Sequence, residues 1–400
     1  MTISRADASG LARNVPDPWD AARHRALWPL EPDMTFLNHG SYGACPHAVL
    51  AAQDEWRRRL ERQPCTFINR TLPRALREAA ADLAAFLQAR AEDVVFVENT
   101  TSGINAILRS LRFGPGDEVV VTDHVYNAVR NTLRFVLEPV DARLVVVPIG
   151  LPMTSPAAVV DAIAAVITDR TRLVLVDHVA SVSAVRFPVA EIAAVARARG
   201  VPVLVDGAHA PGMLDLDVPA LGVDWYVGNV HKWLCGPKGS AFLWARADRQ
   251  TGLHPTVISH DLGKGFTAEF DKIGTRDASA WLAVPAALAF HQQLGGTVLR
   301  QRNHELAVAA GRRLAERLTT ETGAAEELFG SMATIRLPGR QPADRPTADA
   351  LKAWLWDTHR IEAHVMPFAG ALWVRISIQA YNDMADVDRL GDALTARLLA

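Results

Sequence analysis

Short runs of β-branched and other apolar residues alternate with longer helical patterns from about residue 48 to residue 246. This repetition favours a largely parallel sheet that is covered by helices on both faces. Ligands of such sheets bind beyond the carboxyl ends of the strands, where loops and helix N-termini converge. The polar residues that directly follow the strands are therefore the first candidates for a functional site.

Seven strands and five helices are expected in this region. The strands cover Val94–Val97, Glu118–Thr122, Arg143–Ile149, Leu173–Asp177, Val203–Asp206, Trp225–Val227 and Ala241–Ala245. The helices cover Leu72–Gln88, Gly103–Leu111, Val125–Leu137, Pro156–Ile167 and Val189–Arg199. The sequence thus predicts the α/β class, with helices that connect or precede the strands.

The pattern changes after residue 290, where helices and strands no longer alternate regularly. The elements expected there are a helix over Leu299–Thr319, an extended segment over Met332–Leu337, a helix around Ala348–Thr358, a strand over Leu372–Ile378 and a closing helix over Asp386–Leu399. Residues 1–35 contain four prolines and few strand signals. We expect an N-terminal arm over 1–35, a large domain over 36–290 and a small α+β domain over 291–400.

Composition excludes several classes of protein. Of the 400 residues, 49% are apolar and 22% are charged, which is ordinary for a globular domain. The net charge of −2 gives no reason to expect a nucleic acid or an anionic membrane as a partner. The most apolar stretch, Ala157–Ile167, is too short to span a bilayer, and the N-terminus lacks the apolar core of a signal peptide.

The three cysteines are widely spaced and form no C-x-x-C motif, which argues against a disulfide framework and a structural zinc site. A reducing cytoplasm is the simplest compartment for such a chain. The thirteen histidines show no metal-ligand spacing, so we expect no metal.

The most informative stretch runs from Val203 to Gly239. Asp206 closes an apolar strand, and Lys232 follows shortly after the next strand, next to His231. A lysine that binds a carbonyl cofactor must be partly deprotonated, and a desolvated pocket lowers its pKa. An acidic residue under a pyridine ring keeps the ring nitrogen protonated and makes the ring an electron sink. This order suits pyridoxal phosphate; the alternative is a turn-capping Asp206 and a surface Lys232.

Two further stretches follow strands directly. Glu98–Asn105 leads hydroxyl residues into a helix, which is a candidate phosphate cradle, although an ordinary helix N-cap is the alternative. The stretch lacks the lysine of a P-loop, and the chain has no G-x-G-x-x-G, so neither ATP nor a dinucleotide is implied. In Asp123–Ala128, Tyr126 is our first choice to stack on a cofactor ring and His124 the second; core packing of Tyr126 is the alternative.

Together these stretches resemble the class V aminotransferase family of fold-type I pyridoxal phosphate enzymes. Asn38–Pro46 is similar to the N-terminal motif of the isopenicillin N epimerase branch, and Phe270–Asp277 to the family's Gly-Thr-Arg-Asp motif. Arg375–Ser377, followed by Tyr381 and Asn382, is similar to its carboxylate-binding segment. The resemblance implies the aspartate aminotransferase-like fold, in which a large domain with a mostly parallel seven-stranded sheet carries a smaller α+β C-terminal domain.

The resemblance also implies a role for each matching residue. Lys232 would hold pyridoxal 5′-phosphate covalently and move the Cα proton, and Asp206 would pair with the ring nitrogen. The other cofactor contacts would be Thr100, Thr101, Tyr126, Ser181, His209, Asn229, His231 and Thr275. Because Thr275 would reach the phosphate of the neighbouring subunit, the expected state is a homodimer with a shared active site. Arg375 would clamp the substrate carboxylate, with Asn38 as a further substrate contact. Apart from the resemblance, Arg70 lies in a loop-like segment near the N-terminal motif and is a further candidate to meet a substrate carboxylate.

The reaction remains open at this stage. The first choice is β-elimination of the C–S bond of a cysteine-derived thioether amino acid, in sulfur metabolism or antibiotic biosynthesis. The second is epimerisation at Cα, and in either reaction Tyr126 is the candidate proton donor. Decarboxylation coupled to oxidative deamination, transamination and a non-catalytic binding protein are further alternatives. A persulfide-forming desulfurase is disfavoured, because no cysteine follows Cys235.

Overall fold

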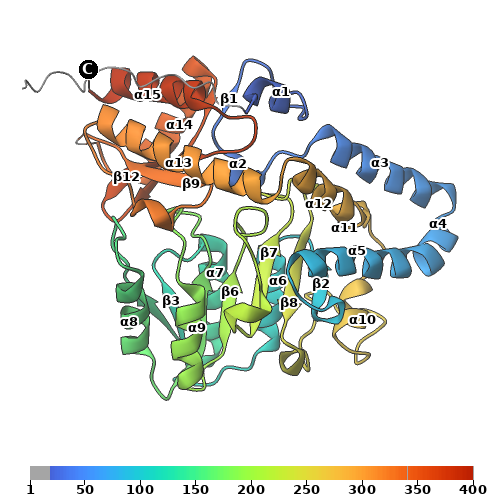
Figure 1. The fold of residues 1–400 in the computed structure, drawn as a ribbon. Coiled ribbons are helices and arrows are strands. Elements are labelled where there is room, and N and C mark those ends of the chain that lie inside the picture. Colours follow the sequence, from blue (N-terminus) through green and yellow to red (C-terminus); the bar gives the residue numbers. More distant parts are fainter. Residues whose placement is uncertain (1–18, 340, 400) are drawn as a thin grey trace, which may run out of the picture.

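The computed structural model describes residues 19–339 and 341–399. Residues 1–18, which make up half of the expected N-terminal arm, lie outside the described residues. The chain builds a large sheet with helices on both faces and a smaller sheet, with its own helices, at one end of it (Figure 1).

The large sheet has seven strands, as the sequence predicts. Their spatial order is β2 (Val94–Val97), β8 (Ala241–Ala245), β7 (Trp225–Asn229), β6 (Val203–Asp206), β5 (Thr171–Asp177), β3 (Glu118–Thr122) and β4 (Arg143–Val147). The five strands from β7 to β4 run parallel, whereas β8 runs antiparallel to both of its neighbours. The mostly parallel sheet expected from the sequence is therefore confirmed.

Both faces of the large sheet are buried beneath helices. Successive side chains of each strand point to opposite faces, so each strand contributes to two apolar clusters. Val120 packs with one apolar cluster, and its chain neighbours Val119 and Val121 pack with the other. The first cluster is covered by α5 (Leu72–Phe86), α8 (Pro156–Val166) and α9 (Val189–Ala198). The second is covered by α6 (Thr100–Ser110), α7 (Asn127–Leu137) and α10 (Phe266–Asp271).

Polar side chains cap two of the helices that cover the large sheet. The Asn99 side chain accepts a hydrogen bond of 2.9 Å from the Ser102 N–H and so begins α6 directly after β2. Ser155 caps α8 in the same way and is followed by Pro156, whose fixed φ suits the first helical turn. These caps fix where the chain turns from a strand into a helix at the carboxyl edge of the sheet.

The small sheet consists of three antiparallel strands. Their order is β11 (His364–Phe368), β12 (Ala371–Ser377) and β9 (Met332–Arg336). Helices α13 (Thr297–Arg317), α14 (Arg345–His359) and α15 (Met384–Leu398) accompany it. We retain the division near residue 290 as a proposal, since the helical cover of the small sheet begins at Thr297.

The N-terminal segment joins the two parts of the molecule. Strand β1 (Thr35–Phe36) pairs in parallel with β10 (Ile361–Glu362), and Asn38 forms a bridge with Ser377. The remaining helices are α1 (Ala21–Arg25), α2 (His39–Tyr42), α3 (His47–Arg62), α4 (Pro64–Thr66), a π-helical turn (Phe67–Thr71), α11 (Ser279–Leu282) and α12 (Val284–Gln293). This pairing places the Asn38–Pro46 motif beside the strand that carries Arg375.

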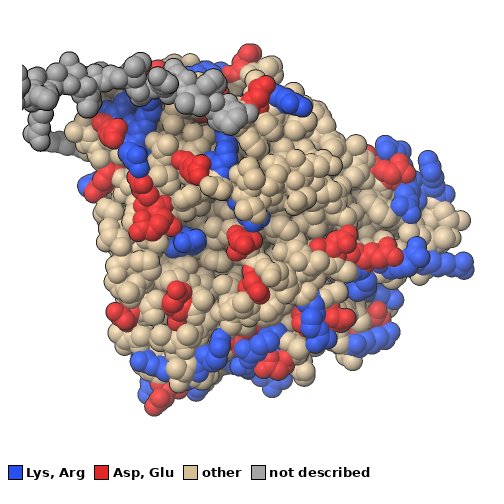
Figure 2. Space-filling model, viewed as in Figure 1, with Lys and Arg blue, Asp and Glu red and all other residues tan. Residues whose placement is uncertain are grey.

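Acidic and basic side chains are interspersed on the face shown in Figure 2, without an extended field of one sign. Among the described residues, no helix is both long and apolar enough to cross a membrane.

Candidate active site

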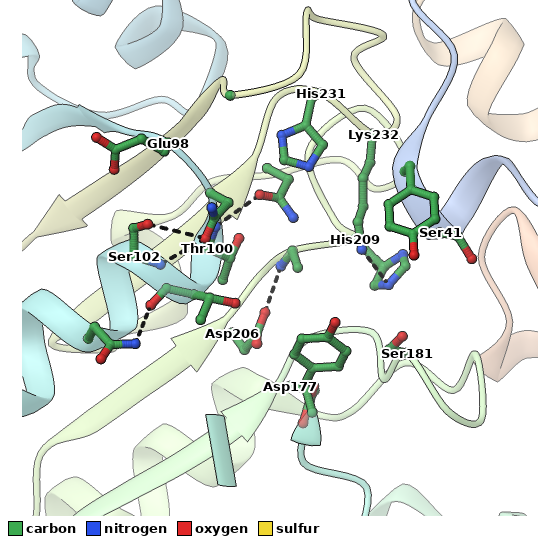
Figure 3. A pocket seen from close by; sticks show the side chains of 18 of the residues that line it. Ser41, Glu98, Thr100, Ser102, Asp177, Ser181, Asp206, His209, His231 and Lys232 are labelled. Carbon is green, nitrogen blue, oxygen red and sulfur yellow. Dashed lines mark hydrogen bonds between the residues drawn. The ribbon is translucent and has the colours of Figure 1, made fainter. Parts of the chain in front are cut away.

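One cavity of about 640 Å³ lies at the carboxyl ends of the central strands (Figure 3). Nine of the predicted site residues line it: Thr100, Thr101, Tyr126, Ser181, Asp206, His209, Asn229, His231 and Lys232. Because they come from five separate segments at the ends of β2, β3, β5, β6 and β7, only the topology of the parallel sheet brings them together. Its size lies within the range of about 300–1,000 Å³ that is typical of small-molecule sites.

Lys232 lines the cavity, and it is only 9% exposed. Burial, helped by the nearby positive charge of Arg375, lowers the pKa of its amine to about 7, although Asp206 and Asp177 act in the opposite direction. A lysine in water has a pKa near 10.4. A large share of the Lys232 amine is therefore unprotonated near neutral pH, which is the form that attacks a carbonyl.

The backbone of Lys232 is held by the N-terminal motif. The His39 Nε2–H donates a hydrogen bond of 3.0 Å to the Lys232 carbonyl oxygen, and His39 Nδ1 accepts one of 2.7 Å from the Tyr381 hydroxyl. Gly43 has a φ of +71°, and a Cβ there would lie 2.0 Å from the His231 carbonyl oxygen. Only glycine permits this close approach. The Asn38–Pro46 motif thus fixes the loop from which Lys232 projects.

His209 receives two hydrogen-bonding groups in the buried site. The Trp233 indole N–H, which can only donate, lies 3.4 Å from His209 Nδ1, so this nitrogen accepts. Burial and the neighbouring cations lower the pKa of His209 well below its usual value, so the ring is neutral. Its proton then sits on Nε2, 3.0 Å from the Lys232 Nζ atom, and an unprotonated amine is the matching acceptor.

Asp206 ends β6 and is almost fully buried, at 3% exposure. Its Oδ1 atom accepts a hydrogen bond of 3.0 Å from the Ala208 N–H, while burial raises its pKa to about 6. No ion pair of the described residues includes this carboxylate. A carboxylate kept buried without a salt-bridge partner is poised to receive a cationic ring nitrogen.

The opposite end of the cavity is built for an anion. Helix α6 begins there at Thr100, whose buried Oγ1 atom has no hydrogen-bond partner. The Thr100 N–H donates to the Asn229 Oδ1 atom over 3.0 Å, and the hydroxyls of Thr101 and Ser102 lie on the same helical turn. Hydroxyl donors at a positive helix terminus form a phosphate cradle. A lysine, a buried carboxylate and such a cradle around one cavity fit pyridoxal phosphate.

Arg375, on β12 of the small sheet, is only 1% exposed; it does not itself line the cavity but contacts Ser41 and Ser181, which do. One terminal nitrogen donates to the Ser181 backbone oxygen over 2.5 Å, and the other donates to Ser41 Oγ over 3.1 Å. Its buried Nε atom has no partner, and no ion pair of the described residues includes it. Burial lowers the pKa of this guanidinium to about 10, so it remains charged at neutral pH. Its side chain can therefore receive a carboxylate.

The other predicted residues lie outside the cavity lining. Asn38 is buried behind the arginine, where its Oδ1 atom accepts a hydrogen bond of 3.2 Å from Arg375. Arg70 and Thr275 are exposed. Tyr126 is 45% exposed and lines the cavity, whereas His124 is fully buried and hydrogen-bonded to Ser183 and Ile149. His124 is therefore not the stacking residue.

Several lining residues were not selected from the sequence: Ser41, Tyr42, Ser102, Asn105, Asp177 and Thr256. Four of them lie within motifs that the sequence analysis did identify, namely Ser41, Tyr42, Ser102 and Asn105. For these four residues, the motif itself was the signal that could have predicted a place in the site. Asp177 ends a predicted strand just as Asp206 does, and the same argument applied to that strand would have found it. Thr256 follows β8 in an irregular loop, and no local pattern marks it.

No group of three or more metal-ligating side chains that could hold a metal ion occurs among residues 19–339 and 341–399. We assign the site no metal ligand.

Comparison with known proteins places this geometry in a family. The model of the family described as aminotransferase class-V matches residues 45–390. An isopenicillin N epimerase of Streptomyces clavuligerus is 35% identical over 403 residues, which cover 94% of this chain and 98% of that protein. A putative L-cysteine desulfhydrase 1 of Oryza sativa subsp. japonica is 33% identical over 400 residues, covering 91% and 83%.

The fold has close counterparts among solved structures. The complex of the cystine C–S lyase C-DES with its reaction product, cysteine persulfide, matches with a TM-score of 0.78 at 22% identity. The match covers 91% of this chain and 97% of the other chain. At this identity the likeness shows the fold, and the expected aspartate aminotransferase-like architecture is confirmed.

Proposed function

The chain belongs to the class V aminotransferase family of pyridoxal phosphate-dependent enzymes, and from this premise we propose that it cleaves the C–S bond of a cysteine-derived amino acid. The observation that carries the proposal is the pairing of two buried basic side chains with opposite tasks. A large share of the Lys232 amine is unprotonated near neutral pH, while Arg375 keeps its charge and pairs with no carboxylate of the described residues. An α-amino acid offers the matching groups, an amine and a carboxylate.

The residues divide the chemistry of such a substrate between them. Pyridoxal phosphate, when bound, supplies an electron sink for the charge that develops at Cα. Arg375 orients the substrate through its carboxylate, since the Ser181 and Ser41 contacts fix the plane of the guanidinium. Lys232 is the base for the Cα proton. Tyr126 lines the cavity and is 45% exposed, and we assign it the task of giving a proton to a departing sulfur.

Cleavage of a cysteine S-conjugate would yield a thiol, pyruvate and ammonia. Support for a cysteine-derived substrate comes from the relatives at 30–35% identity, several of which are named L-cysteine desulfhydrases. A desulfurase mechanism is not proposed, because residues 236–400 contain no cysteine to accept sulfur. The open mouth of the cavity, beside the 76% exposed Tyr42, leaves room for a substituent on sulfur.

Epimerisation at Cα is the second candidate. It is favoured by the 35% identity to isopenicillin N epimerase and by the availability of Tyr126 as a second proton donor. Both reactions begin with removal of the same Cα proton by Lys232. They differ in whether the β-substituent leaves before a proton returns.

We further propose that the protein acts as a homodimer with a shared active site. Thr275 and Arg70 lie exposed outside the cavity of their own chain, which suits contacts with the site of a second copy. Val257 and Ile258, which follow the cavity residue Thr256, are 50% and 54% exposed. Sedimentation of the protein at several concentrations tests the dimer.

The three cysteines form no disulfide, and we retain the reducing cytoplasm as the proposed compartment.

One incubation separates the two reactions. The purified protein, loaded with pyridoxal phosphate, is incubated with a cysteine S-conjugate in heavy water. Release of pyruvate and thiol in equal amounts supports the lyase. Recovery of intact substrate with deuterium at Cα and no pyruvate supports the epimerase. Carbon dioxide release would indicate decarboxylation, and no reaction with any of several S-conjugates would contradict the proposed substrate class.

A further inference from the structure

A second buried carboxyl group lies beside Asp206. Asp177 ends β5, and the two aspartates are register partners across the β5–β6 pair. Figure 3 shows both on the same side of the cavity, which Asp177 also lines. Asp177 is only 3% exposed, and its buried Oδ2 atom has no hydrogen-bond partner. Neither the family motifs nor the proposed reaction assigns it a task.

Two negative charges at this spacing oppose each other. Register partners on neighbouring strands lie about 4.8 Å apart, so two ionised carboxylates at these positions would repel each other. Burial and the charge of Asp206 both raise the pKa of Asp177 well above its usual value. The other ionisable groups around the cavity are the acids Asp206 and Glu98, the phenols Tyr126 and Tyr226, the bases Lys232 and Arg375, and the histidines His178, His209 and His231. Burial lowers the pKa of each of these three histidines, so their rings are neutral at pH 7.

Of these groups, only Lys232 and Arg375 can neutralise a carboxylate. With a pKa of about 7, Lys232 carries only part of a positive charge near neutral pH, while Arg375 already donates to Ser181, Ser41 and Asn38. His209 is neutral. The site therefore holds charge to balance one carboxylate beneath the cofactor ring but not two, and the cheaper state keeps one proton on the pair.

We propose that Asp177 is the protonated member of a one-proton carboxyl pair with Asp206. The pair then carries one negative charge, on Asp206, and one O–H donor, on Asp177 next to it. Asp177 is a positioning residue, since it acts through Asp206 and Lys232. The inference rests on the proposed function only for the place of the ring over Asp206.

The protonation of Asp177 has a consequence for Lys232. An ionised Asp177 would stabilise the ammonium form of Lys232, because the negative charge of Asp177 raises the lysine pKa. A protonated Asp177 leaves the amine free of that influence. The same proton satisfies one carboxyl oxygen that would otherwise be a buried charge without a partner.

The direct test is the titration of the aspartate carboxyl carbons by NMR in isotope-labelled protein without cofactor or substrate. We expect one buried carboxyl to remain protonated at pH 7 and its signal to be absent from Asp177→Asn. In Asp206→Asn the repulsion is gone, so the same signal should titrate at a lower pH than in the wild type. A buried pair in which both carboxyls are ionised at pH 7 would overturn the proposal. If Asp177→Asn does not fold, the wild type and Asp206→Asn alone decide the question.

The affinity for pyridoxal phosphate provides a second measurement. If Asp177 had a merely structural role, Asp177→Ala and Asp177→Asn would not change this affinity in the way described next. Asp177→Ala removes the O–H donor and should weaken pyridoxal phosphate binding by about 10-fold, the value of one hydrogen bond. Asp177→Asn keeps a neutral donor and should recover most of this loss. Failure of Asn to recover it, with the fold intact by circular dichroism, would show that a charge at Asp177 is needed. Since neither test uses a substrate, a failed lyase assay leaves both outcomes readable.

Discussion

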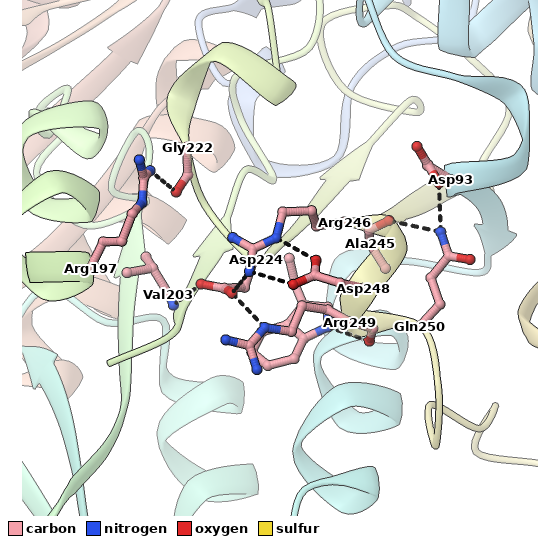
Figure 4. Close-up of polar contacts among 11 residues, drawn as sticks. Asp93, Arg197, Val203, Gly222, Asp224, Ala245, Arg246, Asp248, Arg249 and Gln250 are labelled. Atoms are coloured by element: carbon pink, nitrogen blue, oxygen red, sulfur yellow. Dashed lines mark hydrogen bonds and ion pairs between the residues drawn. The ribbon is translucent and has the colours of Figure 1, made fainter. Parts of the chain in front are cut away.

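The seven-stranded sheet has an amino edge, where its parallel strands begin, and a carboxyl edge, where they end. Among the described residues, buried carboxylates such as Asp224 pair with arginines at the amino edge, whereas Asp206 at the carboxyl edge has no salt-bridge partner. At the amino edge, Asp224 directly precedes β7, and its Oδ1 atom pairs with Arg249 at 2.8 Å and Arg246 at 3.0 Å (Figure 4). Its Oδ2 atom accepts the Val203 N–H over 2.8 Å. At the carboxyl edge, Asp206 closes the neighbouring strand and has only the Ala208 N–H.

Other carboxylates of the amino edge follow the same rule as Asp224. Glu118, which begins β3, pairs with Arg143 at 2.6 Å, and Asp117 pairs with Arg172 at 2.7 Å. A buried charge that is fully paired holds loops and strands together, whereas a buried charge without a partner costs stability and persists where a ligand supplies the partner. The contrast locates the active site without reference to any relative.

Removing the amine of the carboxyl edge should have the largest effect. Lys232→Ala is expected to lower turnover by at least about 1,000-fold, because it removes both the cofactor anchor and the Cα base. Steady-state assays of pyruvate or of Cα exchange measure the loss. Lys352→Ala on α14 is the matched control, since the one ion pair of this lysine among the described residues is with Asp349 on the same helix, and its turnover should equal that of the wild type.

Asp206→Asn comes next. We expect turnover to fall by about 100-fold or more, because a neutral amide no longer holds the proton on the ring nitrogen. The cofactor should still bind through the α6 cradle, which equilibrium dialysis can check. Turnover within a few-fold of the wild type would refute the role of this carboxylate.

Arg375→Lys should be milder. The planar fork that is held by Ser181 and Ser41 is lost, but a positive charge remains. We expect kcat/KM for an amino acid to fall by about 10- to 100-fold, in line with one charge-assisted hydrogen bond. An amine that lacks the α-carboxylate should react equally poorly with both proteins. Equal losses for the two compounds would place Arg375 outside substrate binding.

Asp224→Asn, at the amino edge, should lower stability rather than turnover. Loss of the charge that pairs with Arg246 and Arg249 should lower the free energy of unfolding by about 1–3 kcal/mol. Turnover per folded molecule should not change, because the amino edge lies at the far end of the strands. Urea denaturation and assays at a permissive temperature measure the two quantities, and a large drop in turnover would erase the distinction between the edges.

The smallest effect concerns pH and the stability of the cofactor-free protein. The folded pKa of Lys232 is about 7, against an unfolded value near 10.4, so between these pH values the unfolded chain binds more protons. The wild type should therefore gain stability as the pH rises from 7 towards 10. Lys232→Met should be more stable than the wild type by about 1–3 kcal/mol at pH 7, and less so at pH 10. An equal difference at both pH values would contradict the lowered pKa.

Much of the large sheet could be predicted from local pattern alone. The observed bounds of β2, β3, β6 and β8 are those expected, because each is a short apolar run with polar flanks. The hairpin strand β11 was missed, since Pro367 and the polar His364 hide its alternation. The parallel pairing of β1 with β10 joins segments more than 300 residues apart, and no local signal predicts such a contact.

The site shows the same division. Asp206, Lys232 and the α6 hydroxyls could be found because each directly follows a strand in the sequence. The burial of Arg375 against Ser181 and Ser41, and the neighbouring position of Asp177, depend on packing between distant segments. The placement of Arg70 and Thr275 against a partner copy stays a prediction, because it needs a second chain.

The central claim, that Lys232 alone carries the cofactor, can be tested by trapping the bond. The chain has five lysines, Lys232, Lys238, Lys264, Lys272 and Lys352. The holoenzyme is reduced with borohydride and digested, and its peptides are weighed by mass spectrometry. We expect one pyridoxyl phosphate group per chain, on the peptide that contains Lys232. A label on any of the other four lysines, or no label in a protein that binds the cofactor, would contradict the account.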